Sequence, residues 1–555
     1  MTRRPHPDLI GDLTGVRAPK PTQGWGPRDA AHGPGMVGER LVRTGKRVPL
    51  WLVVIAAVAC GPEIPDGTPS DGETLTILSP STPGDRIFTP GWPAKFLIFL
   101  PLAERNAEGE LEPRLARSWE HSDDYRNWTI HLRTDVRWHD GVPVTAHDVA
   151  FTLGLMRHPT VGAHPPDAYQ VVVLDDSTYT LEYQREAPGN PFDEWTAYLP
   201  KHLLEGLDPE RFWEWEFWAR PVGNGPYRFG RHVPSTAFVL EANPDYYLAP
   251  PRIGRVVLRL GQVYGTGSST AELLAGKVDA VPYVDQKALL KFADDPRFRI
   301  YYHVIPNQAT AVLWNHRRSG LGDARVRRAL TLAIDRRELR HVLGMPPEIP
   351  VFDGLPTLGL FRRGELPPGL EYDPAEAVRL LEEAGWSDRD GDGVRDQGGR
   401  PLAIELIAST WGQGHNAAVY VQGRLRDVGV GVELVILEHS LARERLYSGD
   451  FDALILGMSG PYTHRDLFGE SSLLGYQSSE ADALLRRAEE TWDPQARDRI
   501  YLRLAEIFQA DLPATILYPD VWRTVAHRRV RGLSSPWMAD PTRHADKLWL
   551  AEDDQ

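Results

Sequence analysis

The apolar and polar positions of this 555-residue chain change their period about half-way along its length. In the first half, the alternation typical of half-buried strands occurs at 74–78 and 128–132, and the strands 171–173 and 179–183 flank a turn at 175–177, which predicts a hairpin. In the second half, helical periods alternate with strands such as 402–407, and the predicted helices are 323–343, 374–384, 419–428, 479–492 and 495–511. This order predicts a mixed α/β protein with at least two lobes.

Four basic residues precede the apolar run 48–59, which ends at the single cysteine of the chain, Cys60. This pattern is typical of a lipoprotein signal peptide, and the run is too short to span a bilayer. We therefore expect a signal peptide at 36–59, lipidation of Cys60 and a tether at 60–72. The protein would be exported and anchored by lipid, in the periplasm or at the cell surface. Residues 1–35 fit no signal, so Met36 is the expected start and the preceding segment an extension outside the expressed protein. The alternative is a buried cysteine that follows an apolar strand.

The composition excludes some classes of function. Hydrophobic residues make up 42% and charged residues 25% of the chain, which is usual for a globular protein. The net charge of −14 argues against a nucleic-acid-binding surface, which is usually basic. The sequence has no phosphate loop, no Gly-x-Gly-x-x-Gly after a strand, no Gly-x-Ser-x-Gly and no His-Glu-x-x-His. We therefore expect neither a cofactor nor an enzyme.

The segment 138–149 contains two His-Asp pairs, at 139–140 and 147–148, and such pairs are compatible with acid–base chemistry or with a metal. A zinc site would need three or four ligands, and no third ligand lies nearby in the sequence. A tight turn followed by a helix explains the pairs better, because Thr145 and Asp148 have the spacing of a capping box. We predict a structural role for this segment.

A second acidic segment resembles the calcium loop of an EF-hand. Asp388, Asp390 and Asp392 stand at alternate positions with a glycine turn. However, the twelfth position is Gly399, so the bidentate glutamate of that loop is missing. The segment is therefore a weak calcium candidate, and the alternative is an acidic turn that leads into the next strand.

Ordered motifs over much of the chain resemble one family. The first block comprises 115–120, 128–133 and 138–151; the later motifs are 224–227, 243–247, 276–279, 323–336, 372–374, 384–386 and 512–518. Together they resemble the family 5 extracellular solute-binding proteins, the peptide- and nickel-type receptors of ABC importers.

The resemblance implies a two-lobed periplasmic-binding-protein-like α/β fold of class II type, hinged around an interlobe cleft. The first lobe would comprise 73–305 with an extra subdomain at about 101–229, the second lobe 306–524, and the tail 525–555 would return to the first lobe. The lobes would close on a solute, with ABC permease subunits and the membrane as partners of a monomer that binds no nucleic acid.

The resemblance also implies where the solute binds. Peptide-binding members have a Gly-Trp-x-x-Asp loop whose aspartate pairs with the amino terminus of the ligand. Aligned from Gly457, the loop's tryptophan becomes Met458 and its aspartate becomes Pro461; Asp466 compensates only if the loop is reshaped. The predicted ligand residues are Thr89, Gly91, Trp92, Trp411, Met458, Ser459, Gly460, Pro461, Tyr462 and Tyr476, with Trp92 and Trp411 as stacking faces.

Several functions stay open at this point. The first is a receptor for a peptide, and the second is the same fold with an oligosaccharide or another small solute. A different class is an exported hydrolase that uses His139, Asp140 and His147, which would have to converge on a pocket. The last is a degenerate family member with a filled cleft that acts as a surface interaction or chaperone protein.

Overall fold

The fold is taken from a computed structural model. It describes residues 74–551 except 81–87, 89–92, 107–109, 162–168, 185–190, 193–195, 262–266, 285, 346, 348, 356–359, 361–362, 411–413 and 536–539. The predicted signal peptide, the lipidation site Cys60 and the tether therefore lie outside the described residues. None of the described helices has the length and apolar character needed to cross a membrane.

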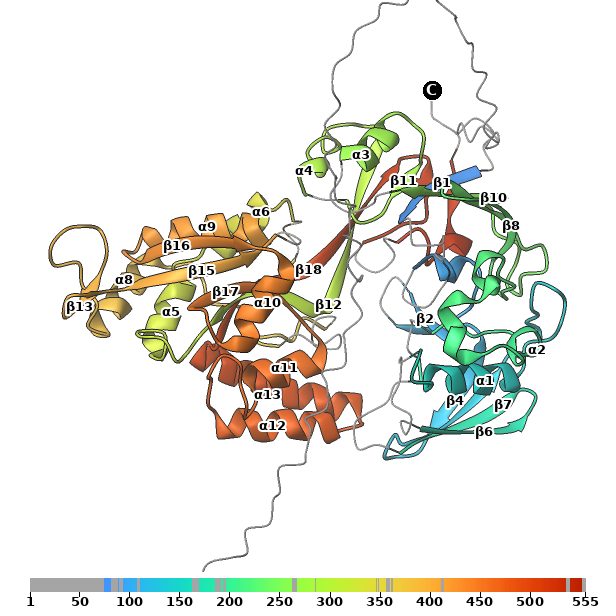
Figure 1. The fold of residues 1–555 in the computed structure, drawn as a ribbon, viewed down its shortest axis with the longest axis horizontal. Helices are drawn as coiled ribbons and strands as arrows, with labels where there is room; N and C mark the ends of the chain where they lie inside the picture. The colour runs from blue at the N-terminus through green and yellow to red at the C-terminus, as the bar shows by residue number, and fades with distance from the viewer. Residues whose placement is uncertain are drawn as a thin grey trace, which may run out of the picture. The chain divides into compact units, whose positions relative to one another are not determined.

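One large sheet runs through the described part of the chain (Figure 1). Its strands, in spatial order, are β16 (Gly431–Leu437), β15 (Ala403–Ser409), β17 (Ala453–Ser459), β12 (Phe298–Trp314), β18 (Ala514–His527), β11 (Ala280–Val281), β1 (Thr74–Pro80), β10 (Arg255–Gly261), β9 (Ala237–Ala242) and β8 (Tyr227–Val233). The two longest, β12 and β18, pair antiparallel and connect the strands on one side of the sheet to those on the other. Their register is irregular between Ile305 and Ala309, at the predicted lobe boundary, and again between Thr310 and Ala311.

A second sheet contains β4 (Ala116–His121), β5 (Asn127–Leu132), β7 (Thr178–Tyr183) and β6 (Tyr169–Asp175), in that spatial order. The predicted hairpin is confirmed, because β6 and β7 pair antiparallel around the turn. The helix α1 (Ala146–Met156) packs beside β6. Within the described residues, three small two-stranded sheets complete the pairings of the named strands: β2 (Ala103–Arg105) with β3 (Leu111–Pro113), β13 (Asp396–Gln397) with β14 (Arg400–Pro401), and β19 (Val530–Arg531) with β20 (Trp549–Leu550).

The buried apolar side chains form separate cores. The largest core joins residues 75–258 with Tyr301 and with 526–548, whereas two further cores consist of residues between 304 and 521. On β15, Leu406 faces one of these two cores and Ile407 the other, so helices must cover both faces of that part of the sheet. The separate cores confirm the prediction of at least two lobes.

Helices form in all five regions of the second half that the periodicity predicts, two of them with clearly different bounds, and the described residues contain two further helices, at 439–448 and 460–468, that were not predicted. The helices are α5 (Ala324–Leu332), α6 (Arg336–Val342), α8 (Pro374–Glu383), α9 (Gly414–Arg426), α10 (His439–Ser448), α11 (Gly460–Phe468), α12 (Ser479–Glu490) and α13 (Pro494–Asp511). The single helix predicted at 323–343 is wrong: Asp335 interrupts it and caps α6 by accepting hydrogen bonds from the amides of Arg337 and Glu338. Helix α9 begins five residues before the predicted 419.

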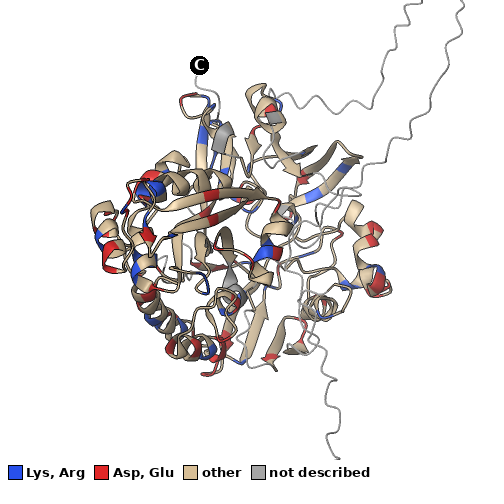
Figure 2. Ribbon diagram, turned by 60° about the vertical axis from the view of Figure 1, so that its left-hand side comes forward, with Lys and Arg blue, Asp and Glu red and all other residues tan. Residues whose placement is uncertain are grey.

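Residues of both charge signs are interspersed along the ribbon (Figure 2). On α8, for example, Arg379 pairs with Glu376 and with Glu383, one turn away on either side. Pairs of this kind contribute little to stability, because water and salt screen charges on an exposed helix. They are typical of a solvated surface.

A buried ion pair ties the end of the chain to its first strand. Arg529 Nε lies 2.8 Å from Asp279 Oδ1, and both side chains are at most 6% exposed. The other carboxylate oxygen of Asp279 accepts a hydrogen bond from the amide of Thr76 on β1, while Arg529 Nη2 donates to the carbonyl of Thr74. Residues after β18 therefore contact the first-lobe part of the large sheet through a fully engaged pair.

We expect Asp279→Asn to lower the free energy of unfolding by about 3 kcal/mol, because Arg529 is left as a buried cation without its counter-charge. Thermal and urea unfolding measure the change. The matched control is Glu371→Gln, which breaks the exposed pair with Arg337 and should cost less than about 1 kcal/mol. Equal losses in the two variants would contradict the prediction.

Candidate functional site

The segment with two His-Asp pairs folds as a tight turn followed by a capped helix. Gly141 has φ +93°, a conformation that favours glycine, and it closes the turn between Trp138 and Val142. Thr145 is the N-cap of α1, and its amide donates to the carboxylate of Asp148 over 2.8 Å, as the capping-box prediction requires. The second oxygen of Asp148 accepts from the amide of Lys201. This carboxylate is therefore committed to backbone amides.

His139 joins two segments that are far apart in the sequence. The amide of Gly223 donates to His139 Nδ1, and His139 Nε2 donates to the carbonyl of Gly225, both over 3.1 Å. The amides of Asn224 and Gly225 in turn donate to the carbonyl of Ile98, which lies so close that a Cβ on Gly223 would approach it to 2.0 Å. One imidazole nitrogen accepts a hydrogen bond and the other donates one, which is the pattern of a neutral ring. His139 thereby holds its own segment against the backbone of residues 223–225.

The remaining residues of the hydrolase hypothesis have other partners. Asp140 Oδ2 lies 2.8 Å from His202 Nε2, and His147 is half exposed and 3.7 Å from Asp176. His139, Asp140 and His147 therefore do not converge on one pocket, which is what an exported hydrolase built on them would need.

Burial lowers the pKa of His139 from 6.5 to about 4, although the hydrogen bond to the carbonyl of Gly225 acts in the opposite direction. The neutral ring is thus favoured in the folded state. The contribution of the neutral ring to the free energy of unfolding is complete above pH 6.5. It is lost as the pH falls from 6.5 towards 4, because in this range His139 is protonated in the unfolded chain but not in the folded one.

We expect stability to fall by about 3 kcal/mol between pH 6.5 and pH 4 on account of this one group. The variant His139→Asn should therefore show a flatter dependence of its melting temperature on pH, measured by scanning calorimetry in that range. His147→Asn is the matched control and should keep the slope of the unchanged protein. An unaltered slope in His139→Asn would refute the assignment.

Three parallel strands of the large sheet end at one edge, which we call the carboxyl edge. β16, β15 and β17 run parallel, and they end at Leu437, Ser409 and Ser459. In open α/β sheets, ligands bind beyond the carboxyl ends of such strands. The predicted ligand residues 458–462 span the end of β17 and the start of α11, and Trp411 follows β15. The end of β17, where the predicted ligand residues 458–462 begin, therefore lies at the edge that the sheet topology favours for a ligand.

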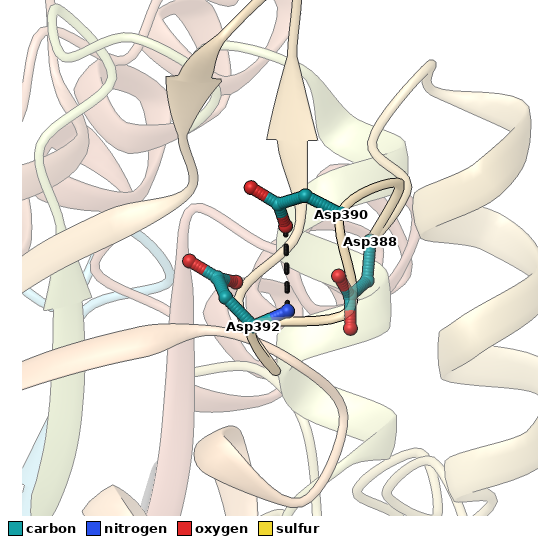
Figure 3. A group of neighbouring side chains, drawn as sticks. All are labelled: Asp388, Asp390 and Asp392. Atoms are coloured by element: carbon teal, nitrogen blue, oxygen red, sulfur yellow. Dashed lines mark hydrogen bonds between the residues drawn. The ribbon is translucent and has the colours of Figure 1, made fainter.

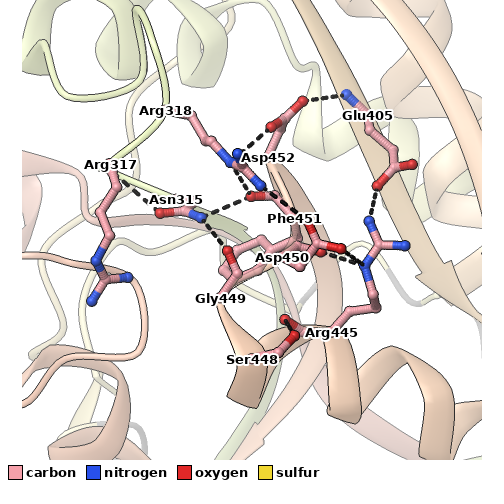
Figure 4. A network of polar contacts seen from close by, with 10 residues as sticks. All are labelled: Asn315, Arg317, Arg318, Glu405, Arg445, Ser448, Gly449, Asp450, Phe451 and Asp452. Atoms are coloured by element: carbon pink, nitrogen blue, oxygen red, sulfur yellow. Dashed lines mark hydrogen bonds and ion pairs between the residues drawn. The ribbon is translucent and has the colours of Figure 1, made fainter.

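A polar network holds the opposite ends of the same strands (Figure 4). Arg318 Nε lies 3.2 Å from Asp452 Oδ1, and the other oxygen of Asp452 accepts a hydrogen bond from the amide of Glu405 at the start of β15. The carboxylate of Glu405 pairs with Arg445 on α10, and the amide of Asn315 donates to the carbonyl of Asp452. These contacts fix the register of β15 against β17 and thereby position the carboxyl edge.

Comparison with known proteins identifies the family. The model of bacterial extracellular solute-binding proteins, family 5 Middle, matches residues 110–480. The chain belongs to this family. The family resemblance predicted from the ordered motifs is thus confirmed, and with it the solute-binding role.

Individual relatives support the same conclusion. The oligopeptide-binding protein AppA of Bacillus subtilis strain 168 is 27% identical over 449 residues, which cover 76% of this chain and 80% of AppA. The solved structure of AppA from Bacillus subtilis in complex with a nonapeptide covers 86% of this chain and 99% of its own, with a TM-score of 0.60 and 23% identity. The solved structure of NikA from Brucella suis in complex with Fe(III)-EDTA covers 86% of this chain and 100% of its own, with a TM-score of 0.69 and 21% identity. The two structures confirm the two-lobed α/β fold.

Two of the predicted ligand residues of this solute-binding protein lie in a hydrophobic core. Met458 is 1% exposed, because side chains alternate along β17 and its neighbour Gly457 takes the open face. Tyr476 is 4% exposed, packs against Phe508 and donates its hydroxyl hydrogen to Asp511 Oδ2 over 2.7 Å. Both side chains are therefore engaged in packing, and their contact with a ligand stays a prediction.

The other predicted ligand residues stay predictions. Thr89, Gly91, Trp92 and Trp411 lie outside the described residues. The backbone of Ser459, Gly460, Pro461 and Tyr462 belongs to β17 and α11, and nothing is described of their side chains. Asp466 is exposed on α11.

Sequence reasoning missed one acidic residue at the carboxyl edge, Asp520 on β18. Its Oδ1 accepts a hydrogen bond from Thr310 Oγ1 over 2.9 Å, and its Oδ2 faces Gly457. The side chain is half-buried, and burial raises the pKa of Asp520 despite the hydrogen bond from Thr310 and the positive charge of Arg523. The available signal in the sequence was a single acidic residue within the largely apolar segment 512–521.

The weak calcium candidate forms a compact turn (Figure 3). Asp388, Asp390 and Asp392 are exposed, and each offers a carboxylate oxygen within 4.8 Å of the others. The carboxylate of Asp388 accepts hydrogen bonds from the amides of Gly391 and Gly393, and that of Asp390 from the amide of Asp392. The loop thus satisfies itself as an acidic turn before β13, as the alternative interpretation expects, and calcium binding stays a prediction.

Proposed function

We propose that this protein is the extracytoplasmic receptor of an ABC importer, which captures a peptide by closure of its two lobes and delivers it to a membrane permease. The observation that carries the proposal is the family match over residues 110–480 together with the relative AppA, which is named an oligopeptide-binding protein. The proposal includes a lipid anchor at Cys60, supported by the basic and apolar segments before it.

The hinge in this proposal is the β12–β18 pair. These strands connect the two parts of the large sheet, and their register is irregular between Ile305 and Ala309. A bulge increases the local twist and weakens the ladder, so bending concentrates there. A domain rotation about such a short segment is the usual route of closure in binding proteins.

A contact between the two lobes supports closure. The ring of Trp492, between α12 and α13, lies 5.3 Å from the ring of Tyr183 on β7. The guanidinium of Arg126, which precedes β5, lies 5.6 Å from the same indole ring. An aromatic pair and a cation–π contact each contribute about 1 kcal/mol, enough to shift an open–closed equilibrium several-fold.

The direct test is native mass spectrometry of the purified protein with any ligand that co-purifies. We expect a peptide in the bound fraction, and we expect synthetic peptides to raise the melting temperature. A shift with oligosaccharides or metal chelates instead of peptides would assign a different solute to the same fold. Protein that shows no shift with any of these classes would contradict the receptor role and favour an interaction protein with a filled cleft.

We expect Trp492→Ala to accelerate dissociation of a bound peptide about three- to tenfold, because the closed state loses its aromatic contacts between the lobes. Stopped-flow release of a labelled peptide measures the rate. The matched control is Trp549→Ala, since Trp549 makes a similar contact with Arg252 within one lobe. A rate unchanged by Trp492→Ala would show that this contact does not hold the closed state.

A further inference from the structure

The carboxylate of Asp520 has fewer partners than the other buried acids. Asp279 and Asp353 each form an ion pair with an arginine and accept a hydrogen bond from a backbone amide. Within the described part of the chain, the hydrogen bond of Asp520 comes from the neutral hydroxyl of Thr310. Arg523 affects Asp520 only through its charge, and its Nη1 donates to the carbonyl of Val521. A half-buried carboxylate with so few partners has a desolvation penalty that its hydrogen bonds do not offset, and a bound cation would offset it.

The free side of this carboxylate opens towards the carboxyl edge. Thr310 pairs with Gly457 across β12 and β17, so both residues present the same face of the sheet. Gly457 is exposed, and a Cβ built on it would meet a single described heavy atom within 4 Å, Asp520 Oδ2 at 3.9 Å. The absence of a side chain at Gly457 thus leaves room above Asp520 Oδ2, two residues before β17 ends.

We propose that Asp520 binds a protonated primary amine of the solute, with Gly457 providing the space through which the amine reaches Oδ2. This inference rests on the proposed function, because it assigns a specificity-determining residue to the same receptor. The amine belongs either to the amino terminus of a peptide or to a lysine side chain.

The geometry favours an ammonium over other cations. Thr310 already takes one acceptor site of Oδ1, and the space at Gly457 opens onto Oδ2 alone, which suits a cation that needs a single oxygen better than a planar guanidinium with two parallel hydrogen bonds. A metal ion would need several oxygen or nitrogen ligands. An ammonium is compact and needs a single well-placed oxygen, with its remaining hydrogens bonded elsewhere. The raised pKa of Asp520 agrees, since it shows that burial outweighs the partners that the protein itself supplies.

The test compares Asp520→Asn with the unchanged protein on three pools of pentapeptides. The first pool has free amino termini and no lysine, the second is Nα-acetylated without lysine, and the third is Nα-acetylated with one lysine. Binding of each pool is measured by native mass spectrometry and by titration calorimetry. The variant keeps the shape of the side chain and an acceptor oxygen for Thr310, and it removes the charge and replaces the other carboxylate oxygen with an amide nitrogen that donates.

We expect Asp520→Asn to weaken binding of the first pool, or of the third pool, about tenfold or more, and to leave the second pool unchanged. A loss confined to the first pool identifies the terminal amine, and a loss confined to the third identifies the lysine amine. The matched control is Glu433→Gln on β16, an exposed acid of the same sheet, which should bind every pool as the unchanged protein does.

A second variant guards against a folding defect. Gly457→Leu fills the space above Asp520 Oδ2 and should reproduce the loss for the amine-bearing pool. In the absence of peptide, Asp520→Asn should melt no lower than the unchanged protein, whereas a purely structural acid would melt lower. Peptide binding that is equal in the unchanged protein and both variants would overturn this inference and leave the receptor role intact. Unchanged protein that binds none of the pools would overturn both.

Discussion

The antiparallel pairing of β12 with β18 is the interaction on which the rest of the structure depends. These strands are 17 and 14 residues long, and they join the parallel strands β15–β17 on one side to β1 and β8–β11 on the other. The lobes therefore share one hydrogen-bonded sheet although their hydrophobic cores are separate. Its strand β12 also pairs with β17, so that Thr310 on β12 meets Gly457 on one side and Asp520 of β18 on the other, and the proposed hinge and the candidate subsite share this strand.

The motifs that identify the family are largely structural. Both ring nitrogens of His139 form hydrogen bonds with the backbone of Gly223 and Gly225, and the amides of Asn224 and Gly225 in turn donate to the carbonyl of Ile98. A side chain on either glycine would collide with Ile98. Such crossings cannot tolerate substitution, whatever the solute. The segment with two His-Asp pairs is thus a structural element of the fold, and the proposed ligand subsite lies at the carboxyl edge.

The acidic residues with little exposure differ in how many partners their carboxylates have. Asp353 and Asp279 are saturated by arginines and by backbone amides, so each closes a contact within the protein. Asp520 has a hydroxyl partner and an open side. A carboxylate held in this condition is unfavourable for the free protein and becomes favourable when a cation arrives, which is the property that a specificity-determining group needs.

The sequence by itself determined the local elements and the family. The strands at 74 and 128, the hairpin after 169 and the capping carboxylate of Asp148 follow from periodicity and from contacts a few residues long. The break at Asp335 was missed because the apolar period continues through it. The Asp335 side chain bonds to the next backbone amides as an N-cap, and this local bonding competes with a continuous helix. Only the tertiary structure decided that Met458 is buried and that Asp520 meets Thr310, 210 residues away. The register of paired strands sets such neighbours, and no local pattern in a single sequence records that register.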